Sequence, residues 1–237
     1  MGSFYSIAGL TVQMDSFGRT EEQAQPYRCE CSGKPDIVMR SFRDDVRKTY
    51  PSVSDDDAEY MGTAAFFYKE LLKFDGFQFH SSAVVVDGRA YLFSANSGTG
   101  KSTHTGLWLR QFGERAYILN DDKPALRLID GIWYAFGTPW SGKHDLSVNT
   151  GVPVAGIAVL ERGTVNQIER YSGKAAIFDV FRQTNRSKSQ ENSILLLELL
   201  DKLFRDVPVW KLRCNMEPEA AVVSYEAMSG KRVKEME

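Results

Sequence analysis

The chain has 237 residues, a formal net charge of −2 at pH 7 and 43% hydrophobic residues. This length predicts one large domain, or one domain with a small appendage. The nearly balanced charge argues against binding to nucleic acid or a membrane surface through bulk charge, and no apolar run is long enough to span a bilayer.

The cysteines and the N-terminal residues favour a cytoplasmic location. Cys29, Cys31 and Cys214 are too few for a disulfide framework, and no second cluster of cysteine or histidine accompanies them to bind zinc. We therefore interpret them as free thiols in a reducing compartment. The first residues also lack the basic start and apolar core of a signal peptide.

The sequence of the first part of the chain predicts a small region separate from the main domain. Short apolar stretches alternate with polar turns over the first fifty residues, which is typical of β-structure. Serine and aspartate then precede apolar residues at helical spacing, and this pattern predicts a capped helix from about Asp55 to Phe74. We place a boundary near Asp75, so that residues 1–75 form a β-rich region with a helix and residues 76–237 form the main domain.

The main domain predicts an α/β fold with a mixed, hairpin-rich sheet. Asp87-Gly88 and Asp130-Gly131 each lie between two runs of strand-forming residues, which is the strongest short hairpin signal. Further strands are expected at 115–122, 152–172 (as a strand pair) and 207–214. Helices are expected at 102–113 (ending at Gly113), 173–186, 189–206 and 217–228. The leucines between Leu195 and Leu200 are expected to be core or an oligomer face.

The stretch SANSGTGKST, residues 94–103, is typical of a phosphate-binding loop. Small residues let backbone N–H groups curl around phosphates, a lysine neutralises the phosphate oxygens, and a Ser/Thr hydroxyl binds Mg²⁺. The usual first glycine is replaced by Ala95, where a small side chain suffices if φ is not positive. The alternative is a polar turn before an ordinary helix. The predicted phosphate-binding residues are Asn96, Ser97, Gly98, Thr99, Gly100, Lys101, Ser102 and Thr103.

Asp121 and Asp122 follow an apolar strand downstream of this loop. We expect that strand to lie beside the loop strand, so that Ser102, Asp121 and Asp122 form a magnesium site. Two neighbouring aspartates can also divide the work, one binding metal and the other taking a proton from an acceptor hydroxyl. The alternative is a solvated turn, since Asn-Asp-Asp is favourable turn sequence.

The stretch Phe77–Arg127 resembles the core of the HPr kinase/phosphorylase and phosphoenolpyruvate carboxykinase superfamily, and Gly137–Arg186 resembles it more loosely. The shared features are the hairpin at Asp87-Gly88, the loop SGTGKST and the strand with its acid pair, LNDD. The resemblance implies a phosphate-loop α/β core that uses ATP and Mg²⁺. It also implies that Asp122 is the catalytic base, that His80 tunes it, and that a homo-oligomer is to be considered.

Other polar residues of the main domain are weaker candidates. Lys143, in the loop GTPWSGKHD, is predicted either to reach phosphate or to lie in a surface turn. Arg182 and Arg186 are predicted either to stabilise the transferring phosphoryl group or to lie on a solvated helix face. Trp140 is expected to pack rather than to stack on a ligand, and His104 to be structural or adjacent to the nucleotide.

These residues together predict a kinase that transfers the γ-phosphoryl group of ATP to a hydroxyl, with serine of a peptide or protein as the acceptor. The catalytic residues would be Asp122, His80, Lys101, Lys143 and Arg182. The alternatives are a small-molecule kinase, a carboxykinase-like enzyme and a nucleotide-binding regulator without catalysis. We expect neither nucleic acid nor a membrane as a partner.

Overall fold

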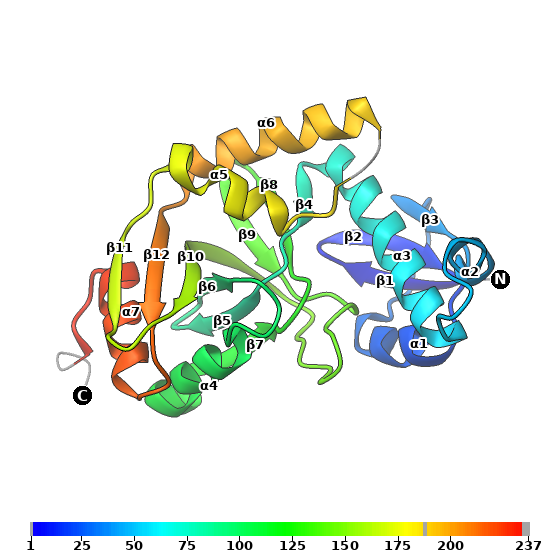
Figure 1. Cartoon of the computed structure of the whole chain (residues 1–237). Helices are drawn as coiled ribbons and strands as arrows, with labels where there is room; N and C mark the ends of the chain where they lie inside the picture. Colours follow the sequence, from blue (N-terminus) through cyan, green and yellow to red (C-terminus); the bar gives the residue numbers. More distant parts are fainter. Residues whose placement is uncertain (1, 187–188, 234–237) are drawn as a thin grey trace.

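The computed structural model describes residues 2–186 and 189–233. It has a mixed α/β fold, with a nine-stranded mixed sheet covered by helices and a separate three-stranded sheet near the N-terminus (Figure 1). This confirms the α/β class and the mixed sheet predicted from the sequence. In the described part of the chain, no helix combines the length and the apolar character that crossing a membrane requires.

The N-terminal elements form a three-stranded sheet with helices around it. The middle strand pairs antiparallel with the first and parallel with the third. These elements are β1 (Ser3–Ile7), β2 (Leu10–Met14), α1 (Gly18–Ala24), the 3-10 turn η1 (Gln25–Tyr27), β3 (Ile37–Met39), α2 (Arg43–Thr49) and α3 (Asp55–Leu71). The β-rich prediction is therefore incomplete, because two short helices, α1 and α2, also lie in this region.

Helix α3 begins and ends as its sequence predicts. Ser54 caps it by accepting a hydrogen bond from the Asp57 N–H, and the 3-10 turn η2 (Leu72–Phe74) extends it to the expected end. Its apolar face packs on the small sheet, where Tyr68 and Phe67 contact Trp140 of the main domain. The packing interpretation of Trp140, which is fully buried, is thereby confirmed. The boundary near Asp75 remains a prediction.

The nine-stranded sheet has the order β4-β8-β9-β10-β6-β5-β7, and β12 and β11 follow along the far part of β10. Its strands are β4 (Gly76–Gln78), β5 (Ser82–Val86), β6 (Arg89–Ser94), β7 (Ala116–Asn120), β8 (Ala125–Ile129), β9 (Ile132–Phe136), β10 (Gly151–Arg162), β11 (Gln167–Arg170) and β12 (Val209–Cys214). Both predicted hairpins are present, β5–β6 and β8–β9. The expected β10–β11 pair is wrong, because β12 lies between them and pairs with both.

Two pairs of helices cover the two faces of the sheet. Helices α5 (Gly173–Arg182) and α6 (Gln190–Asp206) pack on one face, and α4 (Lys101–Phe112) and α7 (Glu219–Ser229) pack on the other (Figure 1). Strand β5 is buried on both faces, since Ala83 and Val85 contact the first layer while Val84 and Val86 contact the second. From α6, Leu196, Leu199 and Leu200 are core residues.

We expected from the sequence that the strand ending in the acid pair would lie beside the loop strand. This prediction is wrong. β5 lies between β6 and β7 and runs antiparallel to both. The carboxyl ends of β6 and β7 therefore meet the amino end of β5 at one edge of the sheet. The loop, the acid pair and the residues before β5 all reach that edge.

Candidate functional site

The segment between β6 and α4 turns through two glycines with unusual backbone angles. Gly98 has φ +76° and Gly100 has φ +121°, a region that side chains with a Cβ disfavour. A Cβ at either position would meet no atom within 4 Å, so backbone conformation rather than lack of space calls for glycine. Ala95 is buried directly after β6 and has no positive φ. Alanine therefore fits where the usual motif has glycine.

The start of α4 presents a row of free backbone donors. Within the described residues, the N–H groups of Gly100, Lys101, Ser102 and Thr103 have no hydrogen-bond acceptor. The first bond of the helix runs from the His104 N–H to the Gly100 carbonyl, at 2.9 Å. The positive end of the helix dipole lies at the same place. A row of free N–H groups at a helix start is an arrangement that binds phosphate.

Lys101 is buried within this turn. Only 9% of the residue is exposed, and its Nζ donates a hydrogen bond to the Ala95 carbonyl at 3.1 Å. Burial lowers the pKa of Lys101, and the charges of Asp122 and Asp121 oppose that shift. An ammonium group buried beside free N–H groups calls for a strong anion as its partner.

Ser82 fixes Asp121 relative to the start of α4. Its hydroxyl donates to Asp121 Oδ1 at 2.6 Å and lies 2.9 Å from Thr105 Oγ1 of the helix. The loop, the helix start and the acid pair therefore keep a fixed relation to one another. This hydroxyl comes from the first residue of β5, the strand inserted between β6 and β7.

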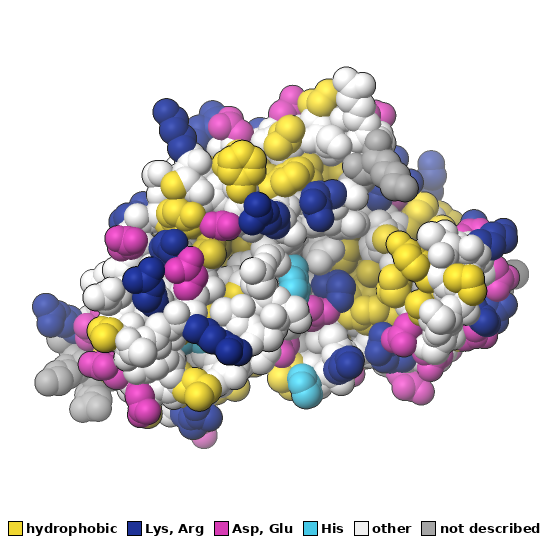
Figure 2. Space-filling view, in the orientation of Figure 1, with side chains coloured by type: hydrophobic (Ala, Val, Ile, Leu, Met, Phe, Trp, Pro, Cys, Tyr) yellow, Lys and Arg dark blue, Asp and Glu magenta, His cyan; other side chains and the backbone are white. Residues whose placement is uncertain are grey.

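The predicted metal and catalytic residues, Arg182 apart, line one cavity of about 500 Å³, which we call the acid-pair cavity. It is lined by His80, Ser97, Gly98, Gly100, Lys101, Ser102, Thr103, Asp121, Asp122, Ser141, Gly142, Lys143 and His144. Lys143 thus lines the same cavity as the loop, on the segment 141–144. The face of the molecule seen in Figure 2 is hollowed between the N-terminal helices and the main domain, and charged side chains gather in this hollow.

Asp122 is held by two basic side chains. His80 Nε2 lies 3.3 Å from its Oδ1, and Lys123 Nζ forms an ion pair with its Oδ2. Burial raises the pKa of Asp122, but the hydrogen bond from His80 and the charge of Lys123 outweigh burial and lower it to about 2. The other ring nitrogen of His80, Nδ1, lies 2.9 Å from Gln183 Oε1. Asp122 is therefore a fixed carboxylate that stays ionised at neutral pH.

The N-terminal region supports the wall that carries Lys143. The Gly142 N–H donates to the Tyr60 hydroxyl at 3.0 Å, and Gln23 Nε2 donates to the Gly142 carbonyl at 3.1 Å. Tyr60 also accepts a hydrogen bond from Lys123 Nζ at 3.3 Å. A single tyrosine of α3 thus contacts both the segment 141–144 and the cation beside Asp122.

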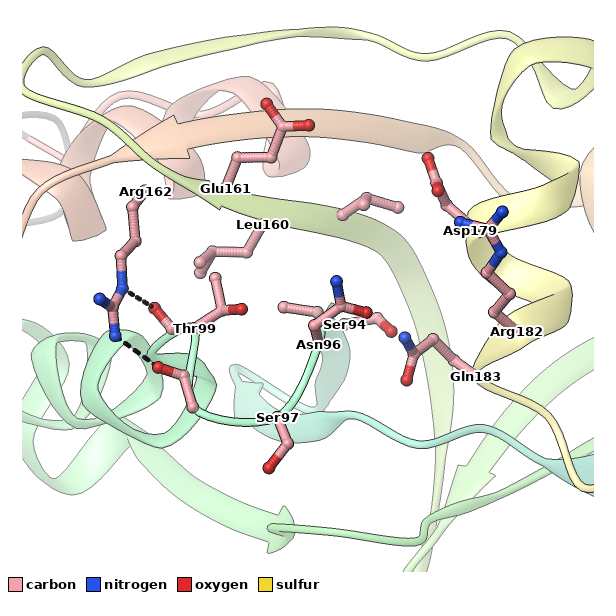
Figure 3. A pocket seen from close by; sticks show the side chains of 13 residues that line it. Ser94, Asn96, Ser97, Thr99, Leu160, Glu161, Arg162, Asp179, Arg182 and Gln183 are labelled. Atoms are coloured by element: carbon pink, nitrogen blue, oxygen red, sulfur yellow. Dashed lines mark hydrogen bonds between the residues drawn. The ribbon is translucent and has the colours of Figure 1, made fainter.

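The far side of the loop borders a second cavity of about 510 Å³, the α5 cavity, between the loop, the end of β10 and α5 (Figure 3). Arg162 binds the loop there: its Nη2 donates to the Gly98 carbonyl at 2.5 Å and its Nε to the Thr99 carbonyl at 3.2 Å. Arg182 lies across this cavity on α5 and does not line the acid-pair cavity. Asn96 and Thr99 also line the α5 cavity.

The residues at the acid pair fit a magnesium ion. Ser102 and Asp121 supply oxygen atoms to the same cavity, and oxygen is the ligand atom that Mg²⁺ prefers. Asp121 forms no ion pair with any described residue, whereas Asp122 is paired with Lys123. Of the two, Asp121 would therefore be the more available to a metal ion. In the described part of the chain there is no group of three histidine, cysteine or acidic side chains that could bind a metal ion.

Several residues of the site were not found from the sequence. Lys123 directly follows the acid pair in the sequence, and this position could have marked it as a candidate site residue. Tyr60, Arg162 and Gln183 reach the site through contacts between distant parts of the chain, which no local pattern marks. His104 is buried behind the loop between Ser224 and Trp108, and it also lines a cavity between the start of α4 and the end of β12.

Comparison with known proteins gives a distant likeness to solved structures. No family model matches the chain, and no curated protein matches it. Among solved structures, an HPr(Ser) kinase/phosphatase from Coxiella burnetii matches 67% of this chain and 92% of its own, with 13% sequence identity and a TM-score of 0.38. A TM-score of this size is too low to establish a shared fold.

Proposed function

We propose that this chain is an ATP- and Mg²⁺-dependent kinase that transfers the γ-phosphoryl group to a hydroxyl of a peptide or protein, with serine as the acceptor. One observation supports the proposal above all. The free N–H row at the start of α4, the buried Lys101 and the acid pair face the same cavity of about 500 Å³.

The phosphates of ATP would lie at the start of α4. The N–H groups of Gly100–Thr103 would donate to phosphate oxygens, and Lys101 would exchange the Ala95 carbonyl for the β- and γ-phosphates. Arg162 would keep the loop in shape, since both of its contacts are to loop carbonyls. When bound by Ser102 and Asp121, magnesium would neutralise charge on the phosphate oxygens.

Asp122 would receive the acceptor hydroxyl. The hydroxyl oxygen forms a bond to the γ-phosphorus while the bond from that phosphorus to the bridging oxygen of ADP breaks. A carboxylate whose pKa is about 2 takes the hydroxyl proton only late, as the new phosphorus–oxygen bond forms. The loose transition state of phosphoryl transfer requires no stronger base. His80 and Lys123 would fix the carboxylate in place.

The acceptor has its own approach to Asp122. His80 and Asp122 also line a second opening of about 300 Å³, together with Gln78, Lys123, Arg182 and Thr184. This opening shares only His80 and Asp122 with the acid-pair cavity, so a nucleotide in that cavity would leave the other side of the opening to the acceptor. A serine side chain on an extended chain could reach Asp122 from that side, with Arg182 beside it.

The proposal is tested by phosphate transfer. The protein is incubated with ATP, Mg²⁺ and serine-containing peptides encoded beside its gene, and phosphate is detected as a mass gain. We expect transfer by the wild type and by the control Lys174→Ala, which changes an exposed lysine of α5, but none by Lys101→Ala. Unchanged transfer by Lys101→Ala would contradict the proposed role of the loop.

A further inference from the structure

A third cavity borders the loop, between the start of α4 and the ends of β10 and β12. It has a volume of about 400 Å³. It shares Thr99, Leu160 and Arg162 with the α5 cavity and Gly100 and Thr103 with the acid-pair cavity, but among these three cavities it alone is lined by Cys214, Asn215 and Met216. Leu160, Cys214 and Met216 give it apolar walls, and Arg162 is its only charged side chain. The α5 cavity, by contrast, contains the carboxylates of Glu161 and Asp179. We call the third one the β12 cavity.

The β12 cavity adjoins the free N–H row at the start of α4. Gly100 and Thr103, the first and last donors of that row, line both the β12 cavity and the acid-pair cavity, whereas Lys101 and Ser102 line the acid-pair cavity and not the β12 cavity. A triphosphate that places its γ-phosphoryl group beside Lys101 and the acid pair runs along the row toward Thr103. The group attached to its α-phosphate would therefore lie at the mouth of the β12 cavity.

The walls of this cavity suit a flat, uncharged aromatic ring. The Arg162 guanidinium is fixed in orientation, because two of its nitrogens donate to the carbonyls of Gly98 and Thr99. A fixed guanidinium plane is a stacking surface for aromatic rings. Met216 is 76% exposed at the mouth, and its polarisable side chain adapts to an aromatic ligand. Burial raises the pKa of Cys214 to about 11, so the thiol is a neutral wall at physiological pH.

We propose that the β12 cavity binds the nucleobase of the nucleoside triphosphate, with the base between the Arg162 guanidinium and the Met216 side chain. This assignment rests on the proposed function, because it takes its direction from a triphosphate at the start of α4. It gives the bound nucleotide a fixed orientation, with the base beside β12 and the γ-phosphoryl group beside the end of β7.

The test compares MgATP with magnesium tripolyphosphate, which has no base, by calorimetric titration. Met216→Asp and Met216→Lys both remove the apolar contact but change the charge in opposite directions. We expect both variants to bind ATP about tenfold more weakly relative to tripolyphosphate than the wild type does. Val165→Asp and Val165→Lys are matched controls, since Val165 is 60% exposed on the neighbouring turn and outside the cavity. We expect them to leave the ratio unchanged.

The outcomes separate the two proposals. If the Met216 variants leave the ratio of ATP to tripolyphosphate affinity unchanged, the nucleobase assignment is wrong while phosphate binding at α4 stands. A wild-type chain that binds neither ligand overturns both. Photolabelling with 8-azido-ATP gives an independent reading: attachment within residues 214–216 supports the assignment, and attachment to α5 residues of the α5 cavity overturns it.

Discussion

The buried imidazole of His104 makes stability depend on pH in a way that can be measured. The residue is 2% exposed, and its Nε2 accepts a hydrogen bond from the Trp108 indole N–H at 3.2 Å. A proton on Nε2 would point at that donor, so the folded chain holds the ring neutral. Burial lowers the pKa of His104 from 6.5 to about 4. Its nearest titratable neighbour, Cys214, is neutral in this pH range.

The sign follows from proton binding. Between pH 6.5 and about 4 the unfolded chain binds a proton at this histidine and the folded chain does not, so stability falls as the pH falls. Each pKa unit is worth about 1.4 kcal/mol. The difference therefore costs about 2 kcal/mol between pH 7.5 and 5, and about 3 kcal/mol once the pH is well below 4.

Urea unfolding at several pH values, followed by tryptophan fluorescence, measures this loss. His104→Gln retains an acceptor for the indole N–H but does not titrate, so its free energy of unfolding should fall less between pH 7.5 and 5 than that of the wild type. His144→Gln, at an exposed position, is the matched control and should follow the wild type. If the wild type and His104→Gln lose stability in parallel, the imidazole is not held neutral in the fold.

Two further predictions concern the acid pair. Asp122→Asn should retain ATP affinity within about threefold and lower the rate of transfer at least about a hundredfold, as expected for loss of the group that receives the acceptor proton; equal losses of binding and transfer would argue against that role. Tyr60→Phe removes the acceptor for the Gly142 N–H and for Lys123, and should cost about 1 kcal/mol in the free energy of unfolding and lower kcat more than ATP affinity. Denaturation and steady-state kinetics test it, and unchanged kcat would show that the N-terminal region supports only the fold.

Local patterns predicted the elements of the main domain because turn residues mark where these elements begin and end. Asp87 and Asp130 take φ +50° before a glycine, which is the geometry of a tight hairpin turn. Gly113, with φ +54°, ends α4 where expected. The two glycines of the loop likewise follow from backbone angles. In each case the residue type is one that favours the local backbone conformation, so the conformation could be predicted from the residue.

The pairing of strands could not be predicted in the same way. Neighbours in sequence favour a hairpin, so β10 and β11 were expected to pair, but β12 returns after two helices and lies between them. The side chains that hold Asp122 and the loop in place, Tyr60 and Arg162, depend on the same distant contacts. Their positions follow from packing between parts of the chain that no short motif connects.

The strand inserted between β6 and β7 explains how this edge becomes a site. Two strand spacings separate the loop strand from the acid strand by about 10 Å, and under the proposed function the phosphates and the metal ion would lie at this edge, between Lys101 and Asp121. Because β5 is antiparallel to both neighbours, its first residues reach this edge, whereas a parallel strand would place them at the opposite one. The hydroxyl that fixes Asp121 and the imidazole that contacts Asp122 both come from there. The hairpin before the loop is thus the feature that supplies the acid pair with its partners.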